Sequence, residues 1–169
     1  VQTCALPIYR RFAPQIYDRV IEVEGEPVLV MHRFDNGLLL SAMVGGGRLG
    51  DNIARGLAKA AASAHGRAEA AHVSGSAIMG GLNAQLARAF RDSPDLFPAA
   101  EARAFASSHR AALDRLTPLL DRRGAEGLVR RCHGDMHCGN IVLLDGVPTL
   151  FDAIEFSEKI ATIDVLYDL

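Results

Sequence analysis

The sequence predicts a mixed α+β protein, and three observations support this fold class. Short apolar runs separated by turn residues lie between residues 17 and 34, a pattern typical of strands. Alanine-rich segments with helical periodicity follow, and short apolar strands then surround a polar cluster. With 49% hydrophobic residues among 169, the chain has enough apolar side chains to fill a core.

Composition argues against several classes of function. A formal net charge of −2 gives no electrostatic reason to expect a nucleic-acid partner. No apolar run approaches the roughly 18 residues of a membrane span, so no membrane association is expected. Three cysteines are too few for a disulfide-stabilised scaffold, and a cytoplasmic location is therefore expected.

The first eight residues resemble a sequence that is not part of a natural protein. Residues 1–8, VQTCALPI, match the translation of a common DNA sequencing adapter. We therefore expect them to be non-native and leave them out of the fold prediction. Because the sequence also stops at Leu169 inside an apolar pattern without a capping signal, we expect it to be an internal piece of a longer protein.

Residues 17–34 predict strand, turn and strand, with the turn at residues 24–27. The second strand, Val28–Met31, is continuously apolar and is therefore expected to be buried. The glycine run at 45–47 lacks the spacing of a phosphate-binding loop, so we expect a flexible loop or turn there.

Three helices are predicted in the middle of the chain. Asp51 is expected to cap the first, which runs to about residue 65. The second covers about 76–91 and the third about 99–122, where Pro118 can introduce a kink. The inner faces are expected to hold Ile53, Leu57, Ala60, Ala61 and Ala64 in the first helix, and Ala102, Phe105, Ala106, His109, Leu113, Leu116 and Leu120 in the third.

Polar side chains that can hold a metal are concentrated between residues 132 and 152. An apolar strand at 141–144, an Asp-Gly turn and a second strand at 149–151 predict a hairpin. Such a hairpin returns Asp152 to the neighbourhood of Asp135 and Asn140. Three oxygen-bearing side chains at one end of a hairpin suit a hard divalent cation bound partly through phosphate.

Two other metal chemistries stay open. Four potential zinc ligands lie within one short loop but lack the two separated ligand pairs of structural zinc sites; they are Cys132, His133, His137 and Cys138. Residues 135–137 and 139–140 also echo metallophosphoesterase motifs. No histidine follows His137 to complete a two-metal site, which weighs against that class.

Residues 133–141, HGDMHCGNI, resemble the HGDLHxGNI catalytic loop of the aminoglycoside phosphotransferase family. Residues 151–156, FDAIEF, resemble its metal-binding segment, and residues 163–169, IDVLYDL, resemble the segment that opens its next helix. The pattern is most similar to bacterial phosphotransferase-like proteins that carry a second, P-loop ATP-binding domain. The resemblance implies a protein-kinase-like fold: mostly the helical large lobe with a catalytic β-hairpin, the small lobe being largely missing.

In this interpretation residues 9–34 are the end of the small lobe and the hinge, and residues 35–169 are a large lobe truncated at its C-terminus. Asp135 matches the catalytic aspartate that takes the proton of the attacking hydroxyl, and His133 matches the histidine that braces the loop. Asn140 and Asp152 match the two magnesium ligands.

Further roles follow from the same resemblance. His137, Asp164 and Asp168 are expected to support the loop, with one of the two aspartates accepting hydrogen bonds from its backbone N–H groups. Backbone groups of His32 and Phe34 are expected to bind adenine, with Met31 packing nearby.

The implied function is ATP-dependent transfer of the γ-phosphoryl group to a hydroxyl of a small molecule, with ATP and Mg²⁺ as cofactors and a possible fused ATP-binding domain. The chain has no glycine-rich nucleotide loop and no lysine on an early strand, so it alone should bind ATP poorly and turn over little. The alternative is a nucleotide-binding or regulatory module of the pseudokinase kind. Retention of Asp135, Asn140 and Asp152 together argues against that alternative.

Overall fold

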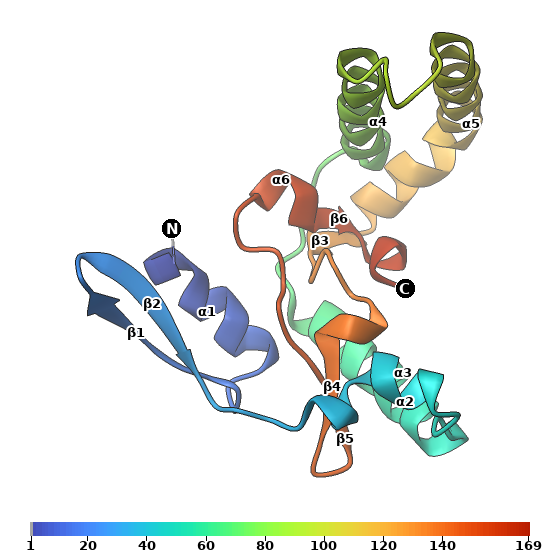
Figure 1. Cartoon of the computed structure of the whole chain (residues 1–169). Coiled ribbons are helices and arrows are strands. Elements are labelled where there is room, and N and C mark those ends of the chain that lie inside the picture. The colour runs from blue at the N-terminus through green and yellow to red at the C-terminus, as the bar shows by residue number, and fades with distance from the viewer. Residues whose placement is uncertain (1) are drawn as a thin grey trace.

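The computed structural model describes residues 2–169 as a mixed α+β protein (Figure 1). In this described part the strands form three separate two-stranded antiparallel sheets. After a first helix, the chain forms a hairpin, a helical block and then short strands. The α+β class predicted from the sequence is therefore confirmed.

The N-terminal unit is a helix packed on a hairpin. Helix α1, Gln2–Phe12, packs against β1, Tyr17–Val23, and β2, Glu26–Met31. Of residues 1–8, which the sequence predicts to be non-native, residue 1 lies outside the described part and residues 2–8 are helical. A buried cluster joins this unit to a later strand; it consists of Ala5, Tyr9, Ala13, Ile16, Tyr17 and Val142.

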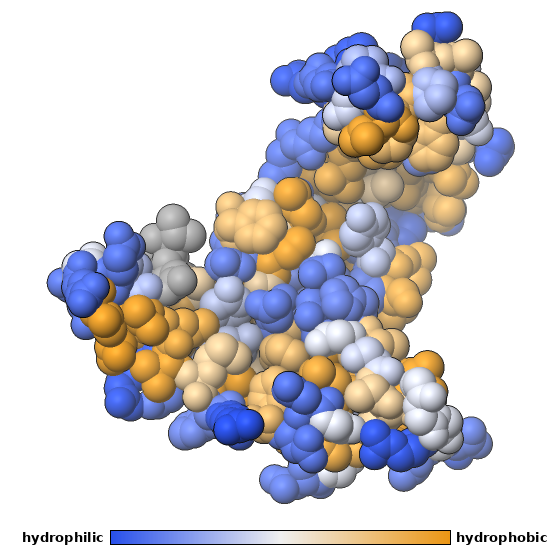
Figure 2. Space-filling model, viewed as in Figure 1, coloured by the Kyte–Doolittle hydropathy of each residue, from blue (hydrophilic) through white to orange (hydrophobic). Residues whose placement is uncertain are grey.

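The strand expected to be buried is not. Within β2, Val28 is 40% exposed and Met31 is 41% exposed. The hairpin is an isolated two-stranded sheet, so α1 can cover part of it while the rest faces solvent. Figure 2 shows apolar residues along the outer part of this hairpin. The prediction of a buried strand is therefore wrong for the described chain.

Helices α2, Leu40–Gly45, and α3, Asp51–Arg67, form the next unit. The glycine run ends α2 and makes the turn expected there, with Gly47 at a φ of +65°. Helix α3 begins at Asp51 with Gly50 as its N-cap, so the expected cap lies one residue too late. Of its expected inner face, Ala61 and Ala64 are buried, whereas Ile53, Leu57 and Ala60 are only partly buried. Helix α3 packs against the strand β5, Val147–Leu150.

Helices α4, Gly75–Asp92, and α5, Ala99–Ala125, form a hairpin that projects from the rest of the chain (Figure 1). Pro118 does not end α5. The expected inner face of α5 is only partly correct, because Phe105 is 42% exposed and Leu116 is 41% exposed. Helix α5 packs chiefly against α4, so much of its circumference faces solvent. Within residues 2–169, no helix has the length and apolar character needed to cross a membrane.

Short strands frame the polar loop at the centre of the molecule. Strand β3, Val129–Arg131, pairs with β6, Thr162–Asp164, which follows the short helix α6, Glu158–Ala161. Strand β4, Ile141–Leu144, pairs with β5. The β3–β6 pair was not predicted, because three residues are too few to show a strand periodicity.

Candidate functional site

The β4–β5 hairpin determines where the polar residues meet. Its turn, Asp145-Gly146, has positive φ at both positions, 48° and 80°, as a tight two-residue hairpin turn requires. At the open end, the N–H of Phe151 donates to the carbonyl of Asn140 over 3.0 Å. Asp152 therefore directly follows the residue that is bonded to Asn140, and the hairpin brings these two segments together as the sequence predicts.

Asn140 and Asp135 are joined directly. The Nδ2 group of Asn140 donates to both the backbone carbonyl and the carboxylate Oδ2 of Asp135, over 3.0 and 3.1 Å. Asn140 is buried, whereas the Asp135 side chain is 53% exposed. Among the described residues no hydrogen bond uses the Oδ1 atom of Asn140, so this amide oxygen is left to accept from, or coordinate, a further group.

Asp152 has an unusual backbone. Its φ is +61°, and among described non-glycine residues such values otherwise occur at Glu24 and Asp145, in the two hairpin turns. Asp152 lies outside any such turn, and strained residues of this kind often occur at functional sites. Partial burial raises the pKa of its carboxyl, and the nearby charges of Glu155 and Asp135 raise it further. A cation placed here would relieve this repulsion.

His133 links the polar loop to the end of β5. It is fully buried, and its Nε2–H donates to the Phe151 carbonyl over 2.8 Å. Its Nδ1 faces the N–H of Asp135 at 3.4 Å, so the arrangement fits the neutral Nε2–H tautomer. Burial lowers the pKa of His133 and outweighs the opposite effect of the Phe151 carbonyl. His133 therefore braces the loop, and its role is positional.

Asp168 anchors the loop from the other side. Only 3% exposed, its carboxylate accepts hydrogen bonds from the N–H groups of His133 and Gly134, over 2.9 and 2.8 Å. The Nε2 atom of His65 lies 3.1 Å from the same carboxylate. Of the two aspartates expected to hold the loop through backbone N–H groups, Asp168 makes these bonds.

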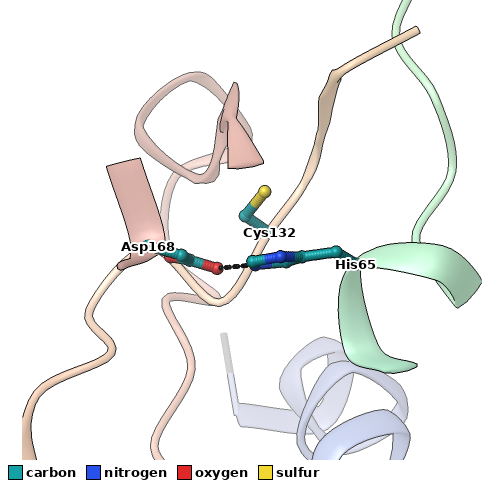
Figure 3. Close-up of side chains that lie close together, drawn as sticks. All are labelled: His65, Cys132 and Asp168. Carbon is teal, nitrogen blue, oxygen red and sulfur yellow. Dashed lines mark hydrogen bonds and ion pairs between the residues drawn. The ribbon is translucent and has the colours of Figure 1, made fainter. Parts of the chain in front are cut away.

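His65, Cys132 and Asp168 also form a group of potential metal ligands (Figure 3). Their ligating atoms all lie within 4.8 Å of one another. The carboxylate already accepts three hydrogen bonds, and the Cys132 thiol contacts the Ile163 carbonyl at 3.5 Å. Burial raises the pKa of that thiol to about 12, which disfavours the thiolate that a metal needs. The arrangement therefore fits an anchor for the loop better than a metal centre.

Asp164 supports a different part of the molecule. Arg123 of α5 binds its carboxylate with two hydrogen bonds, of 2.6 and 2.8 Å. Burial raises the pKa of Asp164, but hydrogen bonds from Arg123 and from the Leu166 N–H outweigh burial and lower it. Asp164 thus ties α5 to the end of β6, whereas Asp168 is the aspartate that accepts from the loop backbone.

His137 lies on the surface of the loop. Its Nδ1 accepts from the N–H of Gly139 over 3.0 Å, and its Nε2 lies 3.7 Å from the Asp135 carboxylate. The side chain is 59% exposed. Loop support, as expected from the sequence, is therefore limited to this local turn and a contact with Asp135.

The four residues considered for zinc do not converge. Cys132 is buried against β6, His133 is directed at β5, and Cys138 is exposed. His137 turns back on its own loop. Within residues 2–169 these four side chains form no common ligand set.

The segment expected to bind adenine, residues 31–34, lies beside the site, but one of its backbone donors is already in use. The N–H of His32 donates to the Ile16 carbonyl over 2.8 Å, so of the two backbone groups of His32 expected to bind adenine, the N–H is already used. The ring of Phe34 packs edge-on against that of Phe151, with centroids 5.2 Å apart. Met31 is 41% exposed. This segment therefore adjoins the residue that precedes Asp152.

Sequence reasoning missed Tyr17. Its hydroxyl accepts the N–H of Asp152 over 2.8 Å, across 135 positions of the chain. Tyr17 begins an ordinary strand pattern, so no local signal in the sequence indicates this contact.

Hydrophilic residues gather at the centre of the face in Figure 2, where Figure 1 places the loop between β3 and β4.

Comparison of the chain with family models, curated proteins and solved structures finds no match.

Proposed function

We propose that this chain is part of an aminoglycoside phosphotransferase-like enzyme that transfers the γ-phosphoryl group of ATP to a hydroxyl of a small molecule. The observation that carries the proposal is the arrangement at the open end of the β4–β5 hairpin: Asn140 is hydrogen-bonded to Asp135, and Asp152 follows Phe151, which donates to the Asn140 carbonyl. Phosphoryl transfer depends mainly on positioning and charge neutralisation, and this set supplies both.

The donor set suits Mg²⁺. Its oxygens come from carboxylate and amide groups, which this ion prefers. Burial, and after it the negative charges of Glu155 and Asp135, raise the pKa of Asp152. We assign Asn140 Oδ1 and the Asp152 carboxylate as the protein ligands. When bound, Mg²⁺ neutralises phosphate charge.

We assign Asp135 as the base. Its carboxylate is half exposed, while Nδ2 of Asn140 fixes one of its oxygens at 3.1 Å. An acceptor hydroxyl can therefore approach from solvent and give its proton to the other oxygen. His133 and Asp168 hold the backbone of this loop through buried hydrogen bonds, which keeps the carboxylate in position.

Binding of manganese with ATP tests the proposal. Mn²⁺ takes the same oxygen ligands as Mg²⁺, and its free concentration can be followed by electron paramagnetic resonance. We expect Asp152→Asn to weaken binding of Mn²⁺ with ATP by at least about tenfold. Asp145→Asn is the matched control. Asp145, like Asp152, is an aspartate with a positive φ, but it lies in the β4–β5 turn, at the opposite end of the hairpin from the candidate site.

Because the chain lacks a glycine-rich nucleotide loop, we expect the parent to bind Mn²⁺ with ATP only weakly. Equal affinities in the two variants, or no binding by the parent even at the highest concentrations of Mn²⁺–ATP that stay in solution, would overturn the proposal. Turnover is a poor primary test. The two lysines of the chain, Lys59 and Lys159, lie on α3 and α6 and not on an early strand, so we expect turnover by this chain near background. Rapid turnover that survives Asp135→Asn would also contradict the assigned base.

A further inference from the structure

Tyr17 contacts the candidate site from the N-terminal unit. It is the first residue of β1 and is 2% exposed. Its hydroxyl accepts a hydrogen bond of 2.8 Å from the N–H of Asp152. The aromatic ring of Tyr17 is thus buried in the core, and its hydroxyl contacts the backbone of Asp152, the residue that we assign as a metal ligand.

The contact occurs where the backbone is strained. At a φ of +61°, Asp152 adopts a conformation that few non-glycine residues adopt outside turns. Hydrogen bonds hold the segment after β5 on either side of Asp152: Phe151 donates to the Asn140 carbonyl, and Ile154 donates to the His133 carbonyl over 2.9 Å. The hydrogen bond to Tyr17 restrains the residue between them, and the direction of its carboxylate follows from this backbone.

The ring of Tyr17 is itself held in place. It stacks on Tyr9 of α1, with centroids 4.6 Å apart and planes inclined by 12°. Arg10 binds the Tyr17 carbonyl through Nε over 3.1 Å, which ties the start of β1 to the same helix. Burial of both rings leaves Tyr17 little freedom to move away from Asp152.

We propose that Tyr17 is a positioning residue that sets the conformation of Asp152 and thereby couples the α1–β1 unit to metal binding. The inference rests on the proposed function, since it takes Asp152 as a metal ligand. It goes beyond that function because it assigns part of the metal affinity to a residue of another structural unit that touches neither metal nor nucleotide.

The test uses Tyr17→Phe, which keeps the ring and removes the hydroxyl. Tyr167→Phe is the matched control, because Tyr167 is 56% exposed. We expect Tyr17→Phe to speed hydrogen exchange of the Asp152 amide and to weaken binding of Mn²⁺ with ATP by about fivefold, the typical contribution of one hydrogen bond. We expect the control to change neither.

A double variant separates positioning from general loosening of the fold. If Tyr17 acts through the Asp152 carboxylate, adding Tyr17→Phe to Asp152→Asn should weaken Mn²⁺ binding no further. A further loss of about fivefold, or a Tyr17→Phe chain that is unfolded at 25 °C, would overturn the inference. Unchanged amide exchange and unchanged metal affinity in Tyr17→Phe would overturn it too, while the proposed function would stand. If the parent fails to bind Mn²⁺ with ATP, the proposed function fails and this coupling to metal fails with it.

Discussion

The buried carboxylate of Asp168 accepts a hydrogen bond from the backbone N–H of His133 over 2.9 Å. The same carboxylate accepts from Gly134 and contacts His65, so one side chain of the C-terminal segment holds the loop that carries Asp135. Backbone N–H groups buried without a partner are costly, and the loop depends on this acceptor.

We expect Asp168→Ala to lower the free energy of unfolding by about 3 kcal/mol, because it leaves one buried and one partly buried backbone donor without their charged acceptor. Urea unfolding followed by circular dichroism measures this loss. Asp114→Ala is the control, since Asp114 is exposed on α5 and should change stability by less than about 0.5 kcal/mol. Equal effects of the two substitutions would show that Asp168 is no anchor.

Because His133 is buried and neutral, we expect the free energy of unfolding to fall in mild acid. Burial lowers its pKa below the usual value near 6.5, so in that range the unfolded chain binds more protons than the folded chain. The contribution of neutral His133 is therefore complete above about pH 6.5. It is lost as the pH falls towards the folded-state pKa, by at most about 1.4 kcal/mol per pH unit.

Urea unfolding at several pH values between 7.5 and 5 checks this slope. His133→Gln should flatten it, whereas His32→Gln, at an exposed position, should leave it unchanged. A parent chain with constant stability over this range would contradict a buried neutral histidine.

The close approach of α4 and α5 predicts that Gly124 tolerates no side chain. A Cβ there would overlap the Val73 carbonyl and lie 3.0 Å from the N atom of Gly75. Because both neighbours are backbone, we expect Gly124→Ala to destabilise the chain by about 1–3 kcal/mol.

Gly66→Ala provides the matched control for this substitution in thermal or urea unfolding. Gly66 lies near the end of α3 with nothing within 4 Å of an added Cβ. The Gly66→Ala substitution should stabilise the chain by up to about 1 kcal/mol, because alanine favours the helical conformation more than glycine does. Similar losses at both glycines would mean that the α4–α5 contact is looser than described.

We expect the ionised carboxylate of Asp152 to favour metal binding at the expense of folding stability. Its raised pKa means that the ionised carboxylate is disfavoured in the folded chain without a cation. Asp152→Asn should therefore unfold at an equal or higher urea concentration at pH 7. That gain should disappear as the pH falls below about 4, where the aspartate is protonated in both states. A clear loss of stability at pH 7 would contradict this explanation.

Much of the fold was predictable because its signals are local. Helices α3, α4 and α5 follow from the spacing of small apolar residues, and each lies within three residues of its expected limits. The Asp145-Gly146 turn requires two left-handed residues and so marked the β4–β5 hairpin. The kinase-like fold and the phosphotransferase activity stay predictions.

Contacts between segments far apart in the chain could not be predicted from such local signals. The exposure of Val28, Phe105 and Leu116 depends on which elements cover them, and periodicity shows a face but not its neighbour. The choice of Asp168 over Asp164 as the anchor depends on Arg123, which binds Asp164 from α5.

The order of amino acids alone establishes the α+β class, the central helices and a polar loop carried by a hairpin. It does so because turn chemistry and helical spacing act over a few residues. Tertiary packing adds the bond from Tyr17 to Asp152 and the bonds from the loop to Asp168. Those partners lie 135 and 35 residues apart, and only the burial of a shared core brings them within hydrogen-bond distance.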